Sequence, residues 1–507
     1  MNFFTSPLLQ QILEVVHANQ IGIEPIYLVG GAVRAFLLQQ EPHDFDFVME
    51  GNVRPFAKKV ADAMGGAFYM LDDERNTARV VYDTPECPRM MIDFAALRGR
   101  DIDSDLKNRD FTINAMALDL FRPDRLIDPL GGAQDLRDRV LRMCSPASLT
   151  DDPARVLRAV RLAVDLELRI AQDTLGALRQ AVTHLHRVSP ERQRDELFRM
   201  LDGDRPQTAL RLMDSIGVFP YLLPELEPLK GLRQPQPHVL DVWEHTLAAL
   251  EEMNTLLSFL AGDYVKEAGT LTVGLAVTHL GRYRTELGRL FNEQLNPNRS
   301  RRSLLAFSIL YHDTGKSAAF SLDEERKIHF YNHEQMSAQL VRGRGERLAL
   351  SQIELNYLTV VVKNHMRIHS LASSEAEEIS RRAQYRYFRA TGQEGIDIIL
   401  LSLADTLATW RTSLRQEHWL RELAVCRTLF DAWCSQRETI VHPLGLINGH
   451  DIQHHFQLKP GPWIGEMLEV VREAQAAGEL TKQEEAFNLL VRWLKQSPKN
   501  LENESLH

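Results

Sequence analysis

Two aspartates spaced two residues apart, Asp44 and Asp46, offer the clearest metal-binding chemistry in the chain. They lie in residues 43–48 (HDFDFV), where polar and apolar residues alternate as they do in a half-buried β-strand. Both carboxylates then point to one side of the strand, while the two phenylalanines point into the core. Adjacent carboxylates repel each other unless a cation lies between them. Mg²⁺ suits such a pair and keeps positions free for phosphate oxygens.

A glycine pair, Gly30 and Gly31, follows an apolar, strand-like segment at residues 26–29. Residues 33–39 have a helical pattern, and a turn between a strand and a helix presents backbone N–H groups to an anion. Arg34 adds a bidentate phosphate donor. With the aspartate pair, these features predict a nucleoside-triphosphate site that uses a metal for phosphoryl transfer. The alternative is a β-turn glycine pair beside two solvated aspartates at a sheet edge.

A second charged pair, Asp152 and Arg155, is spaced to share one face of a helix that opens at residues 151–155. An ionised aspartate only accepts hydrogen bonds and an arginine only donates them. Cytosine and adenine both present an amino donor beside a ring acceptor, so one such pair satisfies either base. Uracil and guanine would oppose the carboxylate with a carbonyl oxygen, which costs about 1–3 kcal/mol. The alternative is that Asp152 only caps the helix ahead of Pro153.

A set of histidines and aspartates follows in the second half of the chain. It comprises His245, His312, Asp313, His333, His365 and Asp405. Mixed imidazole and carboxylate ligands favour Mn²⁺, Fe²⁺, Co²⁺, Ni²⁺ or Zn²⁺ over Ca²⁺. A metal held by Asp313 would acidify a water for attack on phosphorus. Each histidine taken alone is more typical of a capping or exposed residue.

Composition limits the class of protein. The chain has 507 residues with 59 Lys+Arg against 69 Asp+Glu, so a partner nucleic acid must be held by local basic patches rather than by bulk charge. The four cysteines have no CxxC spacing and indicate reduced thiols. We expect no membrane span and no signal peptide, and therefore a cytoplasmic protein.

The periodicity of the chain changes near residue 150. Up to about residue 145 strand-like and helical segments mix, and beyond it the pattern is helical. The fold class expected is an α+β head, with a small mixed sheet, followed by an elongated all-α body. Residues 281–302 carry six arginines with glycine, asparagine and proline, and are expected to form a mobile basic insert. Residues 381–389 interleave arginines and aromatics, which indicates either nucleotide stacking or, preferably, a helix with core aromatics.

Three segments together resemble a known family. Residues 28–34 (LVGGAVR), 44–46 (DFD) and 108–117 (NRDFTINAMA) are similar to motifs of the class II tRNA nucleotidyltransferase and bacterial poly(A) polymerase family. The resemblance implies a polymerase-beta-like head that adds C and/or A from CTP and ATP to the 3′ end of tRNA. Ala35 stands where the family usually has aspartate, and Asn108 where it often has arginine. Neither departure removes an expected metal ligand.

The resemblance also implies roles for individual residues. Asp44 and Asp46 would be catalytic and hold Mg²⁺. The nucleotide-binding residues expected are Gly30 and Gly31 with Arg34 at the triphosphate, Arg109 and Asp110 at the ribose, Asp152 and Arg155 at the base, and Arg158 on the same helix.

The histidine set resembles the HD phosphohydrolase domain that some bacterial members of this family carry. The ligands expected for a first metal are His245, His312, Asp313 and Asp405, with His333 and His365 serving a second metal or the phosphate. Such a domain would hydrolyse 2′,3′-cyclic or terminal phosphates. The domains expected are the head at 1–145, a helical base-recognition and RNA-binding neck at 146–228, the HD domain at 229–440 and a helical tRNA-binding domain at 441–507.

Other functions stay open at this point. A bacterial poly(A) polymerase uses the same head but tends to have a basic tail, whereas this chain has a pI near 6.0. An enzyme that adds only CC or only A is a further alternative. An HD phosphohydrolase with a non-catalytic RNA-binding head, and a non-catalytic tRNA-binding protein, complete the alternatives. The sequence does not indicate an oligomeric state.

Overall fold

The computed structural model describes residues 7–18, 25–42, 44–84, 87–262, 270–296, 299–374 and 378–496. His43, at the start of the predicted aspartate strand, lies outside the described residues. The chain forms two compact units. One comprises Met1–Glu196 with Arg211–Leu222, and the other Leu197–Leu210 with Leu223–His507.

The first unit contains a seven-stranded mixed sheet with strand order β3-β4-β5-β2-β1-β6-β7. Its strands are β1 (Ile26–Val29), β2 (Asp44–Met49), β3 (Ala67–Asp72), β4 (Thr77–Thr84), β5 (Cys87–Ala96), β6 (Ala117–Asp119) and β7 (Arg122–Ile127). β2 and β5 are parallel and the other neighbours are antiparallel. This mixed sheet with helices confirms the predicted class of the head.

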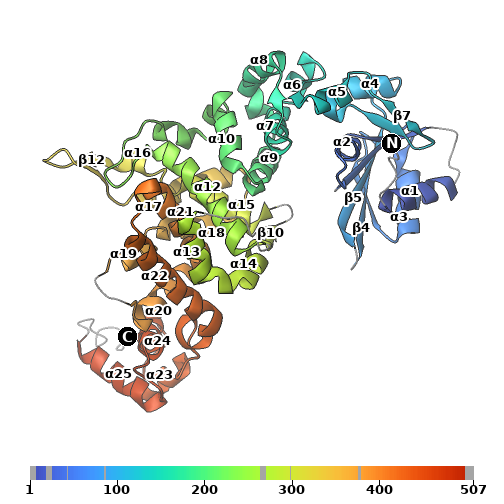
Figure 1. The fold of residues 1–507 in the computed structure, drawn as a ribbon. Helices are drawn as coiled ribbons and strands as arrows, with labels where there is room; N and C mark the ends of the chain where they lie inside the picture. Colours follow the sequence, from blue (N-terminus) through green and yellow to red (C-terminus); the bar gives the residue numbers. More distant parts are fainter. Residues whose placement is uncertain are drawn as a thin grey trace. The chain divides into compact units, whose positions relative to one another are not determined.

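One face of the sheet carries the core of this unit. Phe45 and Phe47 of β2 and Phe94 of β5 are buried there, and the rings of Phe47 and Phe94 stack with centroids 5.2 Å apart. Helix α3 (Val53–Met64) covers this face with Phe56 packed edge-on against Phe94, and α1 (Pro7–Ala18) lies beside it (Figure 1). On the other face a smaller apolar cluster is centred on Val29, Val48 and Leu106.

Helices complete the first unit and continue into the second. They are α2 (Gly31–Leu37), α4 (Ile102–Lys107), α5 (Gly132–Arg137), α6 (Pro146–Asp151), α7 (Arg155–Asp165), α8 (Gln172–Ala181), α9 (Pro190–Asp202), α10 (Pro206–Ser215) and α11 (Phe219–Leu222), with the short strands β8 (Val140–Leu141) and β9 (Arg169–Ile170).

The second unit is almost entirely helical, which confirms the all-α body. Its helices are α12 (Val242–Leu260), α13 (Leu271–Leu280), α14 (Arg284–Phe291), α15 (Arg301–Tyr311), α16 (Lys316–Ala319), α17 (His333–Arg347), α18 (Gln352–Asn364), α19 (Arg367–Ala372), α20 (Arg381–Thr391), α21 (Gly395–Trp410), α22 (Gln416–Ser435), α23 (Gly449–Phe456), α24 (Pro462–Ala476) and α25 (Gln483–Gln496). Two small hairpins interrupt them, β10 (Gln294–Asn296) with β11 (Arg299–Ser300) and β12 (Phe320–Leu322) with β13 (Ile328–Phe330). No helix among the described residues has the length and apolar character that crossing a membrane requires.

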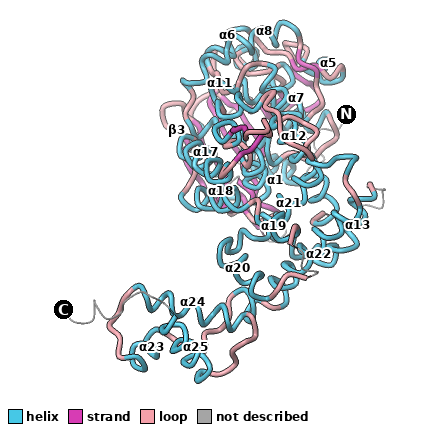
Figure 2. The backbone as a smooth tube through the Cα atoms, turned by 90° about the vertical axis from the view of Figure 1, so that its left-hand side faces the viewer, coloured by secondary structure: helices cyan, strands magenta, loops and turns pink. Residues whose placement is uncertain are grey.

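The C-terminal helices α23, α24 and α25 pack together around their own apolar cluster (Figure 2). Helix α20 contacts α24 through ion pairs. Arg386 donates to Glu473 at 2.6 Å and Arg389 to Glu469 at 2.8 Å, while Tyr387 and Phe388 are buried. The preferred interpretation of residues 381–389, a helix with core aromatics, is therefore confirmed.

The expectation of a mobile basic insert at residues 281–302 is wrong. The segment forms α14, the β10–β11 hairpin and the start of α15, and Arg299 and Arg301 are buried. Arg301 donates to Asp397 at 2.6 Å, and Arg299 pairs with Glu354. These carboxylates lie 96 and 55 residues further along the chain, so the local sequence does not reveal that the arginines have internal partners.

Candidate active sites

The aspartate pair lies on one face of β2, as the alternation predicts. Phe45 and Phe47 point into the core from the opposite face. Asp44 is exposed and Asp46 half-buried, and Asp46 is the direct neighbour of Asp93 on the parallel strand β5. Because paired residues of neighbouring strands point to the same side, three carboxylates share this face.

The glycine turn lies directly beside Asp46. Gly30 has φ 72°, a conformation that a residue with a side chain rarely adopts. A Cβ atom at Gly30 would lie 3.3 Å from Oδ2 of Asp46 and 3.5 Å from a guanidinium nitrogen of Arg109. The turn, the Asp46 carboxylate and Arg109, which is predicted to contact the ribose, therefore meet at one point.

The electrostatics of the carboxylates fit a divalent cation. Burial, and after it the charge of Asp93, raises the pKa of Asp46 to about 6 against the opposing charges of Arg109 and Arg158. Asp93 is itself held by Arg79, whose Nε and NH2 donate to its two oxygens at 2.7 and 2.8 Å. Hard oxygen ligands crowded in this way are the donor set that Mg²⁺ takes, and a bound cation would relieve their repulsion.

A cavity of about 290 Å³ opens beside Asp46 and Asp93. Arg109 and Arg158 line it, and each is fixed by a buried carboxylate. Both the Nε and the NH2 of Arg109 donate to Asp105, at 3.1 and 3.0 Å, and Arg158 donates to Asp110 at 3.2 Å. The cavity therefore has a carboxylate wall for cations and a guanidinium wall for phosphates.

Two predicted nucleotide ligands lie deeper than the sequence suggests. Asp110 is 5% exposed and its carboxylate also accepts from Asn114 at 3.2 Å, so it acts on Arg158 and Asn114. Arg34 donates to the same Asn114 and does not line the cavity, and burial lowers its pKa to about 10. Ribose contact by Asp110 and triphosphate contact by Arg34 stay predictions.

Asp152 and Arg155 line a second cavity of about 880 Å³. The two cavities share Arg155, Arg158, Arg98 and Ala96, so they adjoin. One NH1 of Arg155 donates to the backbone carbonyls of Ser148 and Arg109 at 3.1 and 3.3 Å, which fixes the guanidinium.

Asp152 is held both by a distant helix and by the backbone N–H of Ala154, at the start of α7. Helix α7 begins at Arg155 with Ala154 as its N-cap and no side-chain cap bond. Arg192 of α9 donates to Asp152 at 2.7 Å, and Arg155 lies 3.8 Å away. Burial alone would raise the pKa of Asp152, but the hydrogen bond and charge of Arg192 outweigh it and lower the pKa. The side chain therefore stays ionised and able to accept from a base amino group.

The histidine set converges in the second unit. His245, His333 and Asp405 lie on α12, α17 and α21, and the other members directly follow α15 and α18. His245 Nε2 lies 2.9 Å from Asp405 and 3.7 Å from Oδ2 of Asp313. His312 Nε2 lies 3.2 Å from the same Oδ2. On the other side, His333 and His365 lie 3.3 and 3.9 Å from Oδ1 of Asp313. All of these residues are at least nine-tenths buried.

Backbone carbonyls orient three of the rings. Nδ1 of His312, His333 and His365 lies 2.7–2.9 Å from the carbonyl three residues upstream, which turns each Nε2 toward Asp313. Burial lowers the pKa of His365 to about 3, so this imidazole is neutral, as a metal ligand must be.

The arrangement forms two ligand groups that share Asp313. One contains His245 and His312, and the other His333 and His365. Nδ1 of His245 is buried without a hydrogen-bond partner among the described residues. Nε2 of His245 and Nε2 of His312 face carboxylate oxygens of Asp405 and Asp313 at 2.9 and 3.2 Å, but neither contact has the geometry of a hydrogen bond. Imidazole nitrogens directed at carboxylates in this way fit a pair of transition-metal ions.

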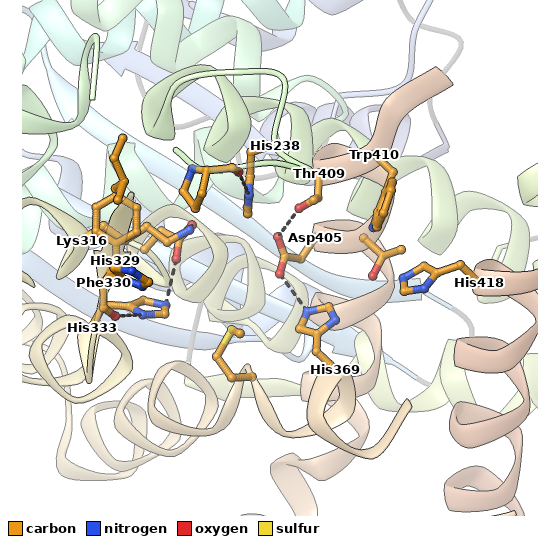
Figure 3. A pocket seen from close by; sticks show the side chains of 15 residues that line it. His238, Lys316, His329, Phe330, His333, His369, Asp405, Thr409, Trp410 and His418 are labelled. Carbon is orange, nitrogen blue, oxygen red and sulfur yellow. Dashed lines mark hydrogen bonds and ion pairs between the residues drawn. The ribbon is translucent and has the colours of Figure 1, made fainter. Parts of the chain in front are cut away.

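Several residues of this site escape sequence reasoning. A cavity of about 330 Å³ reaches Asp313 and Asp405 and is also lined by His238, Lys316, His369, Trp410 and His418. Figure 3 shows His369 and Thr409 directed at Asp405, with His369 Nε2 at 2.9 Å. Lys316 Nζ lies 2.6 Å from Asp313. The spacing of Lys316, three residues after Asp313, and of His369, four after His365, was the available signal.

Family models match most of the chain. The model of the Poly A polymerase head domain matches residues 26–142, and that of the HD domain matches 281–410. Models of an RNA-binding region of polymerase A and of a second tRNA nucleotidyltransferase domain match 167–230 and 429–491. An A-adding tRNA nucleotidyltransferase of Deinococcus radiodurans is 30% identical over 93% of this chain and 96% of its own length. The chain belongs to the tRNA nucleotidyltransferase family.

Other relatives differ in how much of this chain they match. A CC-adding tRNA nucleotidyltransferase of Thermus thermophilus is 28% identical over 92% of this chain and 93% of its own length. A multifunctional CCA protein of Pseudomonas aeruginosa is 34% identical over 45% of this chain and 58% of its own. A solved CCA-adding enzyme in complex with ATP has the same fold, with a TM-score of 0.59 at 23% identity over 96% of this chain and 95% of its own.

Proposed function

We propose that this family member adds C and/or A, from CTP and ATP, to the 3′ end of tRNA. The observation that carries the proposal is the meeting of Asp46, the Gly30 turn and Arg109 at a cavity that adjoins the one lined by Asp152 and Arg155. A nucleotide laid across both cavities has its phosphates beside the carboxylates and its base beside the Asp152–Arg155 pair.

The roles of the chain's own residues follow from their partners. Mg²⁺ held by Asp44 and Asp46 would supply charge neutralisation at the reacting phosphate. The resemblance implies ribose contact for Arg109, but its position beside Asp46 and the Gly30 turn, where Asp105 fixes it, instead favours contact with the triphosphate. Asp152 accepts from the amino group of C or A, and Arg155 donates to the adjacent ring acceptor.

The names of the relatives bear on which nucleotides are added. The curated relatives that match over nine-tenths of both chains are named for adding A or CC alone, but a solved CCA-adding enzyme also matches over nine-tenths of both chains. C addition, A addition and complete CCA addition therefore stay alternatives, which single-nucleotide assays separate. The four-domain division at residues 145, 228 and 440, and a cytoplasmic location beside the tRNA pool, belong to the same proposal.

The test offers purified protein three tRNA primers: one ending before the CCA triplet, one ending in its first C, and one ending in CC. Each primer is given CTP, ATP, UTP or GTP singly with Mg²⁺. We expect incorporation of C or A only, ending within the triplet, and none with the D46A variant. Incorporation of long A tracts would indicate a poly(A) polymerase instead. No incorporation with any primer would overturn the proposal.

A second activity is favoured by the buried centre. The two ligand groups sharing Asp313 suit Mn²⁺, Ni²⁺, Co²⁺ or Fe²⁺, and the adjoining cavity carries Lys316 to receive a phosphate. We therefore include hydrolysis of 2′,3′-cyclic or terminal phosphates in the proposed function. Opening of a 2′,3′-cyclic nucleotide to the 2′- or 3′-monophosphate, or release of inorganic phosphate from a terminal phosphomonoester, would support it if either is lost in D313A while nucleotide addition persists. Equal hydrolysis by both proteins would exclude it.

A further inference from the structure

The active-site face of the sheet extends beyond the carboxylates to the edge strand. Reading across paired residues, Asp46 of β2 neighbours Asp93 of β5, Asp93 neighbours Arg79 of β4, and Arg79 neighbours Tyr69 of β3. Directly paired residues point to the same side, so Tyr69 shares a face with Asp46. With strands about 4.8 Å apart, Tyr69 lies roughly 14 Å from Asp46 across the sheet.

This part of the face is open and partly apolar. Tyr69 is 54% exposed, whereas its neighbours Phe68 and Met70 pack into the core on the opposite face. Val81 and Met91, in the next row toward Asp44, are only half-buried. Phe68 and Met70 attach this edge strand to the core, so the ring of Tyr69 is left exposed. An exposed aromatic ring is a surface on which a base can stack.

The position of the nucleotide cavity indicates what approaches this surface. The cavity runs from Asp46 toward the carboxyl ends of β2 and β5, where Ala95 and Ala96 line it, and Asp44 lies on the opposite side of Asp46. In phosphoryl transfer the attacking and leaving oxygens lie roughly in line. The attacking hydroxyl therefore comes from the Asp44 side, which is continuous with the face that carries Tyr69.

We propose that Tyr69 stacks on one of the last nucleotides of the tRNA primer and so positions its 3′-hydroxyl at the carboxylates. The inference rests on the proposed nucleotide addition. Stacked nucleotides advance about 3.4 Å each, so a 14 Å span corresponds to roughly four nucleotides. Tyr69 is then a positioning residue for the unpaired end of the primer, selective for an exposed base rather than for a sequence. Arg79 is already engaged by Asp93 and acts by fixing that carboxylate.

The test compares Y69A with Y69F and with L71A. Leu71 is the next exposed apolar residue of β3, at 49% exposure, and serves as the matched control for loss of apolar surface on this strand. We expect Y69A to raise the KM for the primer about tenfold, within the range that loss of one base–aromatic stack produces, with the KM for the nucleotide unchanged. Y69F and L71A should stay within about twofold of wild type. A primer carrying 2-aminopurine near its 3′ end should be quenched by wild type and less so by Y69A.

An equal rise in primer KM for Y69A and L71A overturns the inference, as does a rise in the nucleotide KM of Y69A equal to the rise in its primer KM. A change in sedimentation between wild type and Y69A also overturns it, because Tyr69 would then be a contact with a second copy. If wild type extends no primer, the proposed function fails. If wild type extends primers and Y69A is unchanged, only the role of Tyr69 fails.

Discussion

The two candidate metal sites differ in how completely the protein prepares them. On β2, Asp44 is exposed and Asp46 half-buried, and the surrounding arginines and carboxylates neutralise one another. In the second unit the ligands of the histidine centre are nearly all inaccessible, and three rings are oriented by backbone carbonyls. The first site presents a few ligands to solvent, whereas the second is an enclosed, oriented ligand set.

This difference in exposure indicates which metal each site would bind. Mg²⁺ dehydrates reluctantly and is usually held by one or two carboxylates together with substrate phosphates. The Asp44–Asp46 pair, open to solvent beside a nucleotide cavity, matches that behaviour. A buried cluster of oriented imidazoles instead matches a resident transition metal. We therefore expect the head to bind its ions together with each nucleotide, and the histidine centre to retain its own ions between turnovers.

The largest effect is expected from removing one ligand at each site in turn. D46A should reduce nucleotide addition by about 10³-fold or more, because metal stabilisation of the transition state contributes several kcal/mol. D313A should abolish transition-metal content, since Asp313 belongs to both ligand groups, and leave addition nearly unchanged. Incorporation assays and metal analysis on the same preparations measure both.

The control for this pair of variants is D93A, which removes a carboxylate from the same face as Asp46 but keeps the Asp44–Asp46 pair. We expect it to reduce addition less than D46A does. If D313A loses nucleotide addition while circular dichroism shows that it is folded, the two sites are not independent.

Metal removal should separate the sites more finely. Brief treatment with a chelator should stop addition at once, and adding Mg²⁺ alone should restore it on mixing, because the head's ligands are open to solvent. Roughly two transition-metal ions per chain should survive the same treatment and gel filtration, as expected for a buried two-metal centre. If all metal is released at the same rate as nucleotide addition is lost, burial does not make the histidine centre retain its metal longer than the head does.

A smaller effect is expected where the head reads the base. D152A removes the acceptor for the amino group of C or A, and should reduce discrimination against U and G by about 10- to 100-fold, since one opposed polar pair is worth about 1–3 kcal/mol. Total incorporation of the correct nucleotide should fall only a few-fold. Single-nucleotide assays give the ratio. If D152A folds poorly but its choice of base is unchanged, Asp152 has only a structural role.

Sequence reasoning recovered the parts of both sites whose signals are local. The alternation in residues 43–48 located the aspartate face, and the order of histidines located the buried centre. Strand β3 was missed because Tyr69 and Leu71 are exposed apolar residues, which removes the alternation that marks a half-buried strand. What sequence could not supply are pairings between distant residues.

Those distant pairings decide several outcomes. His369 acquires its role from Asp405, 36 residues away, and Asp152 is held by Arg192, 40 residues away. The six arginines of residues 281–302 suggested a solvated insert, yet Arg301 is buried against Asp397. Whether a charged residue is exposed or buried depends on whether it has an ion-pair partner, and that partner can lie far away in the sequence.

The smallest expected effect concerns the pH dependence of the head alone. The folded-state pKa of Asp152 lies below its ordinary value of 3.8, chiefly because Arg192 opposes the effect of burial. A lowered pKa contributes stability that is present above the unfolded-state pKa and is lost as pH falls through the folded-state pKa. D152N should therefore destabilise the region around α7 at pH 7, by at most about 1 kcal/mol for a partly exposed pair, and by less below pH 4. Hydrogen exchange of the α7 amides at both pH values, corrected for intrinsic rates, measures the difference. If the destabilisation of α7 by D152N grows as the pH falls, the Arg192–Asp152 ion pair does not stabilise this region.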